Sequence, residues 1–236
     1  MKILVTGSAK GLGRALVERL AAPGRDMVIH YRSSKGPAEE AAAAVDALGA
    51  KAHLVAADLY SAVGAATIAD FVRAELGGLD VLVNNVGGFI VKHLDDLTSE
   101  EWEAQIASTV SATYHMTKAV IDLLRVSGRG RIVNLSDSGA DKLAARPRTL
   151  PYYVGKTGVL IVTRTMAVTE APYGVTVNAI MPGVLDNSDP LPSATKIPAG
   201  RHGSLDDVGA AVEFLVSEEA AYVTGSFIQV GGGWNL

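Results

Sequence analysis

Tyr152 and Lys156 are the residues whose types and spacing most directly suggest chemistry. A spacing of four residues in a helix places both side chains on one face. A nearby ammonium group stabilises a phenolate and so lowers the pKa of the tyrosine towards neutral pH. The phenol could then donate a proton to a carbonyl oxygen as a hydride reaches its carbon. Tyr153 competes for this role, but its i+4 residue is Thr157; we therefore predict Tyr152 as the acid of a reduction.

The first residues of the chain have the pattern of a nucleotide site. A strand is predicted near 2–6, and the sequence TGSAKGLG follows it before a helix begins near Leu12. Glycines allow a tight turn and a close approach to a pyrophosphate, and the helix N-terminus offers free N–H groups. We expect the cofactor to be bound by Gly7, Ser8, Lys10, Gly11, Leu12 and Gly13.

The end of the second predicted strand indicates which cofactor binds. An acidic residue there would accept hydrogen bonds from the ribose and favour NAD. The sequence instead reads Ile29-His30-Tyr31-Arg32-Ser33-Ser34, without an acid. Arg32 and Ser33, with Lys10 in the glycine turn, can donate to a 2′-phosphate. The sequence therefore predicts NADPH/NADP, held at this end by Tyr31, Arg32 and Ser33.

Aliphatic runs alternate with amphipathic stretches along the whole chain. Strands are predicted near 2–6, 27–31, 51–56, 79–84, 130–135, 174–180 and 226–230, and helices near 12–22, 37–48, 64–77, 99–126 (with a break), 152–171 and 205–217. Strands that are apolar throughout suit a parallel sheet covered on both faces. We expect residues 1–236 to form one α/β domain, a Rossmann-type doubly wound parallel sheet with helices on both faces. Segments 137–151 and 183–204 follow strands and have no assignment, which suits ligand-binding loops.

Composition excludes several other classes of protein. The net charge is −4 with no run of like charges, which argues against nucleic acid or an anionic membrane as partner. The chain has no cysteine and only five scattered histidines, so we expect no disulfide and no metal. The start of the chain reads as a strand rather than a targeting peptide, and no apolar run is long enough to cross a bilayer. A cytoplasmic enzyme is expected.

Several motifs together resemble the short-chain dehydrogenase/reductase family. They are the T-G-x-x-x-G-x-G turn, Asn84-Asn85-Val86-Gly87 (close to N-N-A-G), the Y-x-x-x-K pair and Pro182-Gly183 after a strand. The resemblance implies that Asp58 and Leu59 hold the adenine and that Asn85 and Gly87 line the cofactor cleft. It also implies that Lys156 holds the nicotinamide ribose, that Pro182 and Gly183 contact the carboxamide, and that the chain forms a homo-oligomer, a tetramer or dimer.

The sequence departs from the family pattern at two positions. The family has a catalytic serine after its fifth strand, and the alignment places Asp137 there, with Ser136 and Ser138 on either side. Because the stretch to Tyr152 is about two residues longer than usual, Ser138 could take that role instead. Thr109 stands where the family has an asparagine, and it cannot offer an amide's donor and acceptor together.

These departures leave three functions open. The body of the chain resembles 3-oxoacyl-[acyl-carrier-protein] reductases, which implies reduction of a small or carrier-linked ketone. Asp137 and the His30-Tyr31-Arg32-Ser33 run instead resemble pteridine reductases, whose aspartate helps to protonate a ring nitrogen. The third possibility is a homologue that binds the cofactor without catalysis.

Overall fold

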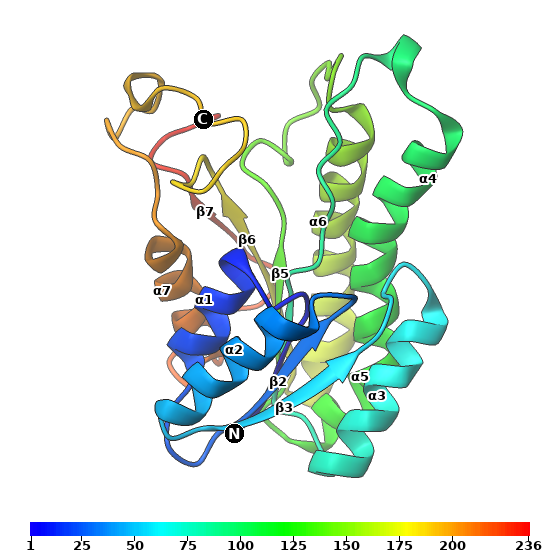
Figure 1. Cartoon of the computed structure of the whole chain (residues 1–236), viewed down its shortest axis with the longest axis vertical. Helices are drawn as coiled ribbons and strands as arrows, with labels where there is room; N and C mark the ends of the chain where they lie inside the picture. Colours follow the sequence, from blue (N-terminus) through cyan, green and yellow to red (C-terminus); the bar gives the residue numbers. More distant parts are fainter.

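A seven-stranded parallel sheet organises the chain (Figure 1). The computed structural model describes all residues, 1–236. The strands are β1 (Lys2–Val5), β2 (Asp26–Tyr31), β3 (Lys51–Ala56), β4 (Val81–Asn84), β5 (Arg131–Leu135), β6 (Thr176–Pro182) and β7 (Phe227–Val230). Their order is β3-β2-β1-β4-β5-β6-β7. This is the doubly wound Rossmann-type order, and it confirms the predicted fold class.

Helices cover both faces of the sheet (Figure 1). They are α1 (Gly11–Leu20), α2 (Lys35–Ala47), α3 (Ala62–Leu76), α4 (Ser99–Ile106), α5 (Ala112–Val126), α6 (Leu150–Glu170) and α7 (Leu205–Val216). α1 contacts α2 and α7 on one side, and α5 contacts α3 and α6 on the other. None of the helices combines the length and the apolar character that crossing a membrane would need.

Successive side chains along the strands face alternate sides of the sheet and so contribute to two hydrophobic cores. In β1, Ile3 and Val5 face the core shared with α1 and α7, whereas Leu4 faces the core shared with α3 and α5. All three side chains are fully buried. Because successive strand residues point to opposite faces, a wholly apolar strand can serve both helical layers.

The predicted elements differ from the observed ones mainly at their ends. The sixth strand is shifted, running over Thr176–Pro182 instead of 174–180. The break expected within 99–126 is a π-helical segment, Ala107–Ser111, between α4 and α5. The segment 137–151 contains no strand, and α6 begins at its end, at Leu150. The segment 183–204 contains neither a strand nor an α-helix, only a short 3-10 helix, Ala194–Lys196.

Candidate active site

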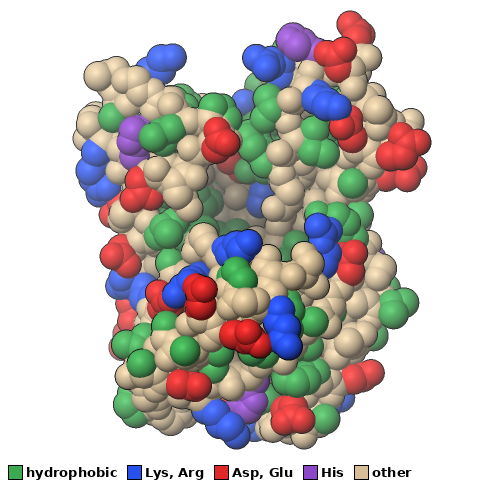
Figure 2. Space-filling view, viewed as in Figure 1, with side chains coloured by type: hydrophobic (Ala, Val, Ile, Leu, Met, Phe, Trp, Pro, Cys, Tyr) green, Lys and Arg blue, Asp and Glu red, His purple; other side chains and the backbone are tan.

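A cavity of about 650 Å³ lies at the carboxyl ends of the parallel strands. Figure 2 shows a hollow on this side of the molecule, between two projecting parts of the surface. The glycine turn contributes Leu12 to its wall, and the loop after β4 contributes Asn85. The opposite wall carries Asp137, Tyr152 and Lys156. The fold thus brings the predicted cofactor end and the predicted reaction end into one cavity, at the strand ends where such sheets bind ligands.

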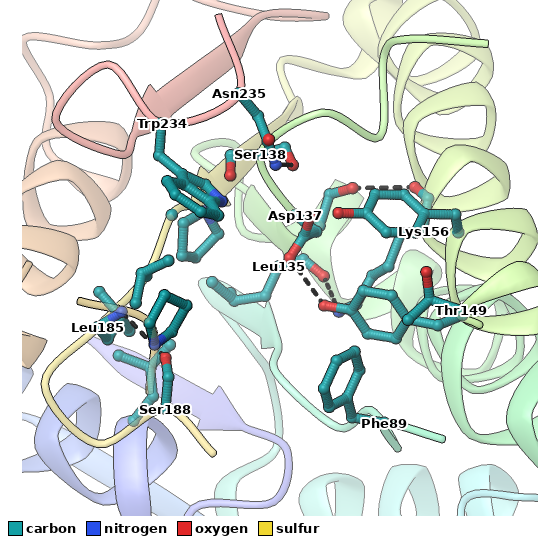
Figure 3. Close-up of a pocket in the computed structure, with 18 of the residues that line it drawn as sticks. Phe89, Leu135, Asp137, Ser138, Thr149, Lys156, Leu185, Ser188, Trp234 and Asn235 are labelled. Atoms are coloured by element: carbon teal, nitrogen blue, oxygen red, sulfur yellow. Dashed lines mark hydrogen bonds between the residues drawn. The ribbon is translucent and has the colours of Figure 1, made fainter. Parts of the chain in front are cut away.

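Tyr152 and Lys156 project into this cavity from the first turns of α6. The helix begins at Leu150 with a proline in its first turn, where the missing N–H has no cost. The Tyr152 hydroxyl donates to Asp137 Oδ2 over 3.0 Å, and Lys156 Nζ lies 5.7 Å from the centre of the Tyr152 ring. Lys156 Nζ donates to the Leu135 carbonyl over 2.8 Å (Figure 3). The predicted acid, its lysine and Asp137 therefore form one cluster.

Burial sets the ionisation of this cluster. Burial raises the pKa of Asp137. It also raises the pKa of Tyr152 well above the usual value, and the Asp137 carboxylate raises that pKa further. Burial also lowers the pKa of Lys156 to about 8, although Asp137 opposes this shift. The expected lowering of the Tyr152 pKa is thus wrong for this structure, because desolvation and a carboxylate outweigh the ammonium group. Tyr152 is consequently a neutral phenol, a proton donor, at pH 7.

Asp137, and neither neighbouring serine, lies next to the tyrosine hydroxyl. The Ser136 hydroxyl donates to the Lys156 carbonyl over 2.9 Å, which fastens β5 to α6. Ser138 lines the cavity, but its hydroxyl makes no hydrogen bond to Tyr152. Its backbone carbonyl accepts from Asn235 Nδ2 over 3.0 Å. Asp137 Oδ1 is buried and makes no hydrogen bond, although the nearby Tyr153 hydroxyl lowers the pKa of this carboxyl.

Thr109 packs against α6 at Gly155. It lies in the π-helical segment, and its hydroxyl donates to the carbonyl of Gln105, near the end of α4, over 2.6 Å. A Cβ on Gly155 would lie 2.1 Å from Thr109 Oγ1, so only glycine permits this approach next to Lys156. Because the Thr109 proton is committed to the backbone, this residue does not supply the donor that an asparagine amide would.

Hydrogen bonds with the side chains of His30 and Asn85 hold the glycine turn in place. Gly7 has a φ of 63°, and its N–H donates to His30 Nδ1 over 2.9 Å. Asn85 Nδ2 donates to the Gly7 carbonyl over 3.2 Å. A Cβ on Gly13 would lie 2.4 Å from that same carbonyl. The Ser8 hydroxyl is buried and donates to the Val5 carbonyl, so Ser8 can offer a ligand only its backbone.

The site predicted to bind the 2′-phosphate of NADPH is exposed to solvent and positively charged. Lys10, Arg32 and Ser33 are exposed, and neither cation forms an ion pair with an acidic residue. The Arg32 guanidinium carbon lies 4.8 Å from the centre of the Tyr60 ring, which leaves its N–H groups free. Tyr31 is half-buried against the core. These donors and the glycine turn fit a phosphorylated dinucleotide.

The two residues expected to hold the adenine differ in their exposure. Asp58 is exposed after the end of β3, and its carboxylate accepts a hydrogen bond from the Tyr60 N–H over 3.0 Å. Leu59 is only 2% exposed and packs in the core shared with α3 and α5. Leu59 can therefore contribute no more than its backbone to a ligand, whereas the Asp58 carboxylate is accessible.

Three further predicted cofactor residues lie near Lys156 or in the cavity wall. Gly87 faces Lys156, whose Nζ would lie 3.3 Å from a Cβ placed on that glycine. Pro182 and Gly183 line the cavity, and the Gly183 N–H donates to the Val230 carbonyl over 2.9 Å. Because that N–H is committed to the sheet, Gly183 has only its carbonyl left for a polar contact with a ligand.

Several residues that line the cavity were not predicted from the sequence. They are Phe89, Arg146, Thr149, Leu185, Ser188, Trp234 and Asn235. The Phe89 ring packs edge-on against Tyr152, with centroids 4.7 Å apart. Most of these residues come from loops and from the end of the chain, where no periodic pattern marks burial. The only signal for Arg146 was its place in the unassigned segment 137–151.

The fold and the site define a Rossmann-type oxidoreductase with a Tyr–Lys pair beside a glycine turn. A family model described as enoyl-(acyl carrier protein) reductase matches residues 7–235. The chain belongs to the short-chain dehydrogenase/reductase family, whose members are oxidoreductases that use a nicotinamide cofactor.

Relatives with several substrates are similar to this chain. Glucose 1-dehydrogenase 2 of Bacillus subtilis is 33% identical, over 99% of this chain and 94% of that protein. The 3-oxoacyl-[acyl-carrier-protein] reductase of Escherichia coli is 32% identical, over 98% and 95%. A solved structure of a blue fluorescent protein from a metagenomic library, in complex with NADPH, has a TM-score of 0.92 at 30% identity and covers 100% of this chain and 98% of its own.

Proposed function

We propose that this chain is an NADPH-dependent reductase in which Tyr152 donates a proton to the substrate. The observation that carries the proposal is the contact of the Tyr152 hydroxyl with Asp137, beside Lys156 and within the cavity that the glycine turn also lines. The bound cofactor would supply the hydride. Tyr152 protonates the atom next to the reduced carbon, and Lys156 holds the nicotinamide ribose.

The preference for NADPH is supported by charge at the open end of the cleft. Lys10 and Arg32 are exposed cations without acidic partners, and strand β2 ends without a carboxylate. The similarity to a structure in complex with NADPH agrees with this preference.

A ketone such as a 3-oxoacyl group is the first candidate substrate. It is supported by the 32% identity to a 3-oxoacyl-[acyl-carrier-protein] reductase along nearly the whole chain. Asp137 favours a second candidate, a pterin-like ring with a C=N bond. The raised pKa of Asp137 and its unpartnered Oδ1 suit a carboxyl group that shares a proton with a ring nitrogen.

Turnover of NADPH with a 3-oxoacyl thioester and with a dihydropterin tests the proposal. Tyr152→Phe should lower kcat by about two orders of magnitude or more, because the ring remains but the proton is lost. The matched control is Tyr153→Phe, which should keep most of the activity. NADPH affinity should stay unchanged in both variants. Tight NADPH binding without turnover of these two substrates or of any other ketone, including oxo acids, would favour the non-catalytic alternative.

We also propose that the chain forms a homo-oligomer. Val154, Ile161 and Val168 are exposed on α6, and their spacing of seven residues places them along one face. An exposed apolar stripe of this kind marks a protein interface.

A further inference from the structure

Arg146 is a cation at the wall of the active-site cavity that the proposed mechanism does not use. It lies in the loop between β5 and α6, four residues before the start of α6. Its side chain lines the cavity together with Asp137 and Tyr152. It makes no ion pair with any acidic residue of the chain.

Two neutral contacts hold the guanidinium group in place, and its charge also lowers the pKa of the Asp137 carboxyl. The guanidinium carbon lies 3.8 Å from the centre of the Tyr153 ring, and Nη2 donates to the Gly139 carbonyl over 2.9 Å. Gly139 has a φ of 88°, and a Cβ there would lie 3.3 Å from Arg146 Nη2. Stacking on an aromatic ring fixes the plane of a guanidinium while leaving its edges free. The position of the charge is therefore fixed before any ligand arrives.

Two of its nitrogen atoms remain without a partner. Nε is buried and makes no hydrogen bond, and Nη1 donates none. Nε is enclosed by protein, whereas Nη1 is not enclosed and is the donor that a ligand in the cavity can meet. A hydrogen bond from a guanidinium N–H to a carboxylate oxygen is charge-assisted and strong.

Distance and charge restrict the ligand further. Tyr153, under the guanidinium, contacts Tyr152 with ring centroids 5.4 Å apart. A group bound by Arg146 would thus lie in the same cavity wall as an atom protonated by Tyr152. Asp137 and Asp189 also line the cavity and would repel a doubly charged phosphate more than a carboxylate.

We propose that Arg146 binds a carboxylate of the substrate, so that the chain acts on a small oxo acid. This inference rests on the proposed reductase function, because it names the substrate class of the same site. Arg146 is then the residue that separates an acid from its neutral ester.

Acetoacetate and ethyl acetoacetate are suitable probes, since they share a ketone and differ in the charge. Their binding to the full chain is measured by NMR titration with and without NADP, which needs no turnover. Arg146→Met should weaken acetoacetate binding at least tenfold, about 1.4 kcal/mol, and change ester binding by less than about twofold. Arg146→Lys should recover part of the loss, because a point charge remains without the planar guanidinium that stacks on Tyr153.

Arg148→Met is the matched control, because it removes an exposed charge from the same loop and should change neither affinity. In turnover, Arg146→Met should raise KM for the acid and leave kcat nearly unchanged. Equal weakening of both probes would show a structural role and overturn the proposal, as would acetoacetate binding that does not depend on Arg146. Binding that depends on Arg146 in a chain without turnover would uphold the carboxylate site while the proposed reductase function failed.

Discussion

Replacing Asp137 with serine separates the two substrate classes, because the carboxyl group has opposite effects on them. Asp137 Oδ2 lies 3.0 Å from the Tyr152 hydroxyl, so it is also close to any oxygen that this hydroxyl protonates. Two full charges about 4 Å apart at an effective dielectric constant of about 20 repel each other by about 4 kcal/mol. The transition-state oxygen carries only part of a charge, so the repulsion there is smaller than between two full charges.

For a ketone, we therefore expect Asp137→Ser to raise kcat/KM about tenfold, which corresponds to about 1.4 kcal/mol. For a pterin-like ring, the same change removes the group that exchanges a proton with the ring nitrogen. Activity should then fall by about two orders of magnitude. Steady-state NADPH oxidation with both substrates measures the two effects on one preparation.

The pH profile provides a second readout. Asp137 raises the pKa values of both Tyr152 and Lys156, so its removal should lower both. In the proposed mechanism, Tyr152 is active as the protonated acid and Lys156 as the cation. The loss of activity on the alkaline side should consequently begin at a lower pH in Asp137→Ser. An unchanged profile and unchanged rates, together with inactivation by Ser138→Ala, would refute this reasoning and make Ser138 the catalytic hydroxyl.

Four further predictions concern the cofactor, the turn, the lysine and assembly. Arg32→Asp should reverse a preference for NADPH of at least about tenfold, measured by titration with both cofactors; equal wild-type affinities would contradict it. Gly13→Ala should destabilise the chain by about 1–3 kcal/mol through overlap with the turn, whereas Gly36→Ala, in open space, should not; thermal melting compares them. NADPH affinity should fall as pH rises through about 8, where Lys156 loses its charge, and a flat profile would disprove this. Ile161→Asp should shift sedimentation towards the monomer, and an unchanged species would exclude the α6 stripe as the interface.

Local sequence determined much of this protein. The apolar runs specified the strands because a parallel sheet covered on both faces buries every residue of a central strand. The glycine turn was recognisable because glycine readily accepts the φ of 63° at Gly7 and alone permits the close approach at Gly13. Tyr152 and Lys156 are four residues apart on one helix, so their shared face followed from helical geometry alone.

Tertiary structure decided what depends on residues distant along the chain. The sequence predicted a lowered pKa for Tyr152, but burial and Asp137, fifteen residues earlier, raise it. Segment 137–151 has no periodicity, so only packing against Tyr153 and Gly139 places Arg146 in the cavity wall. Desolvation and side-chain contacts of this kind arise when separate elements meet, and no spacing within one element encodes them.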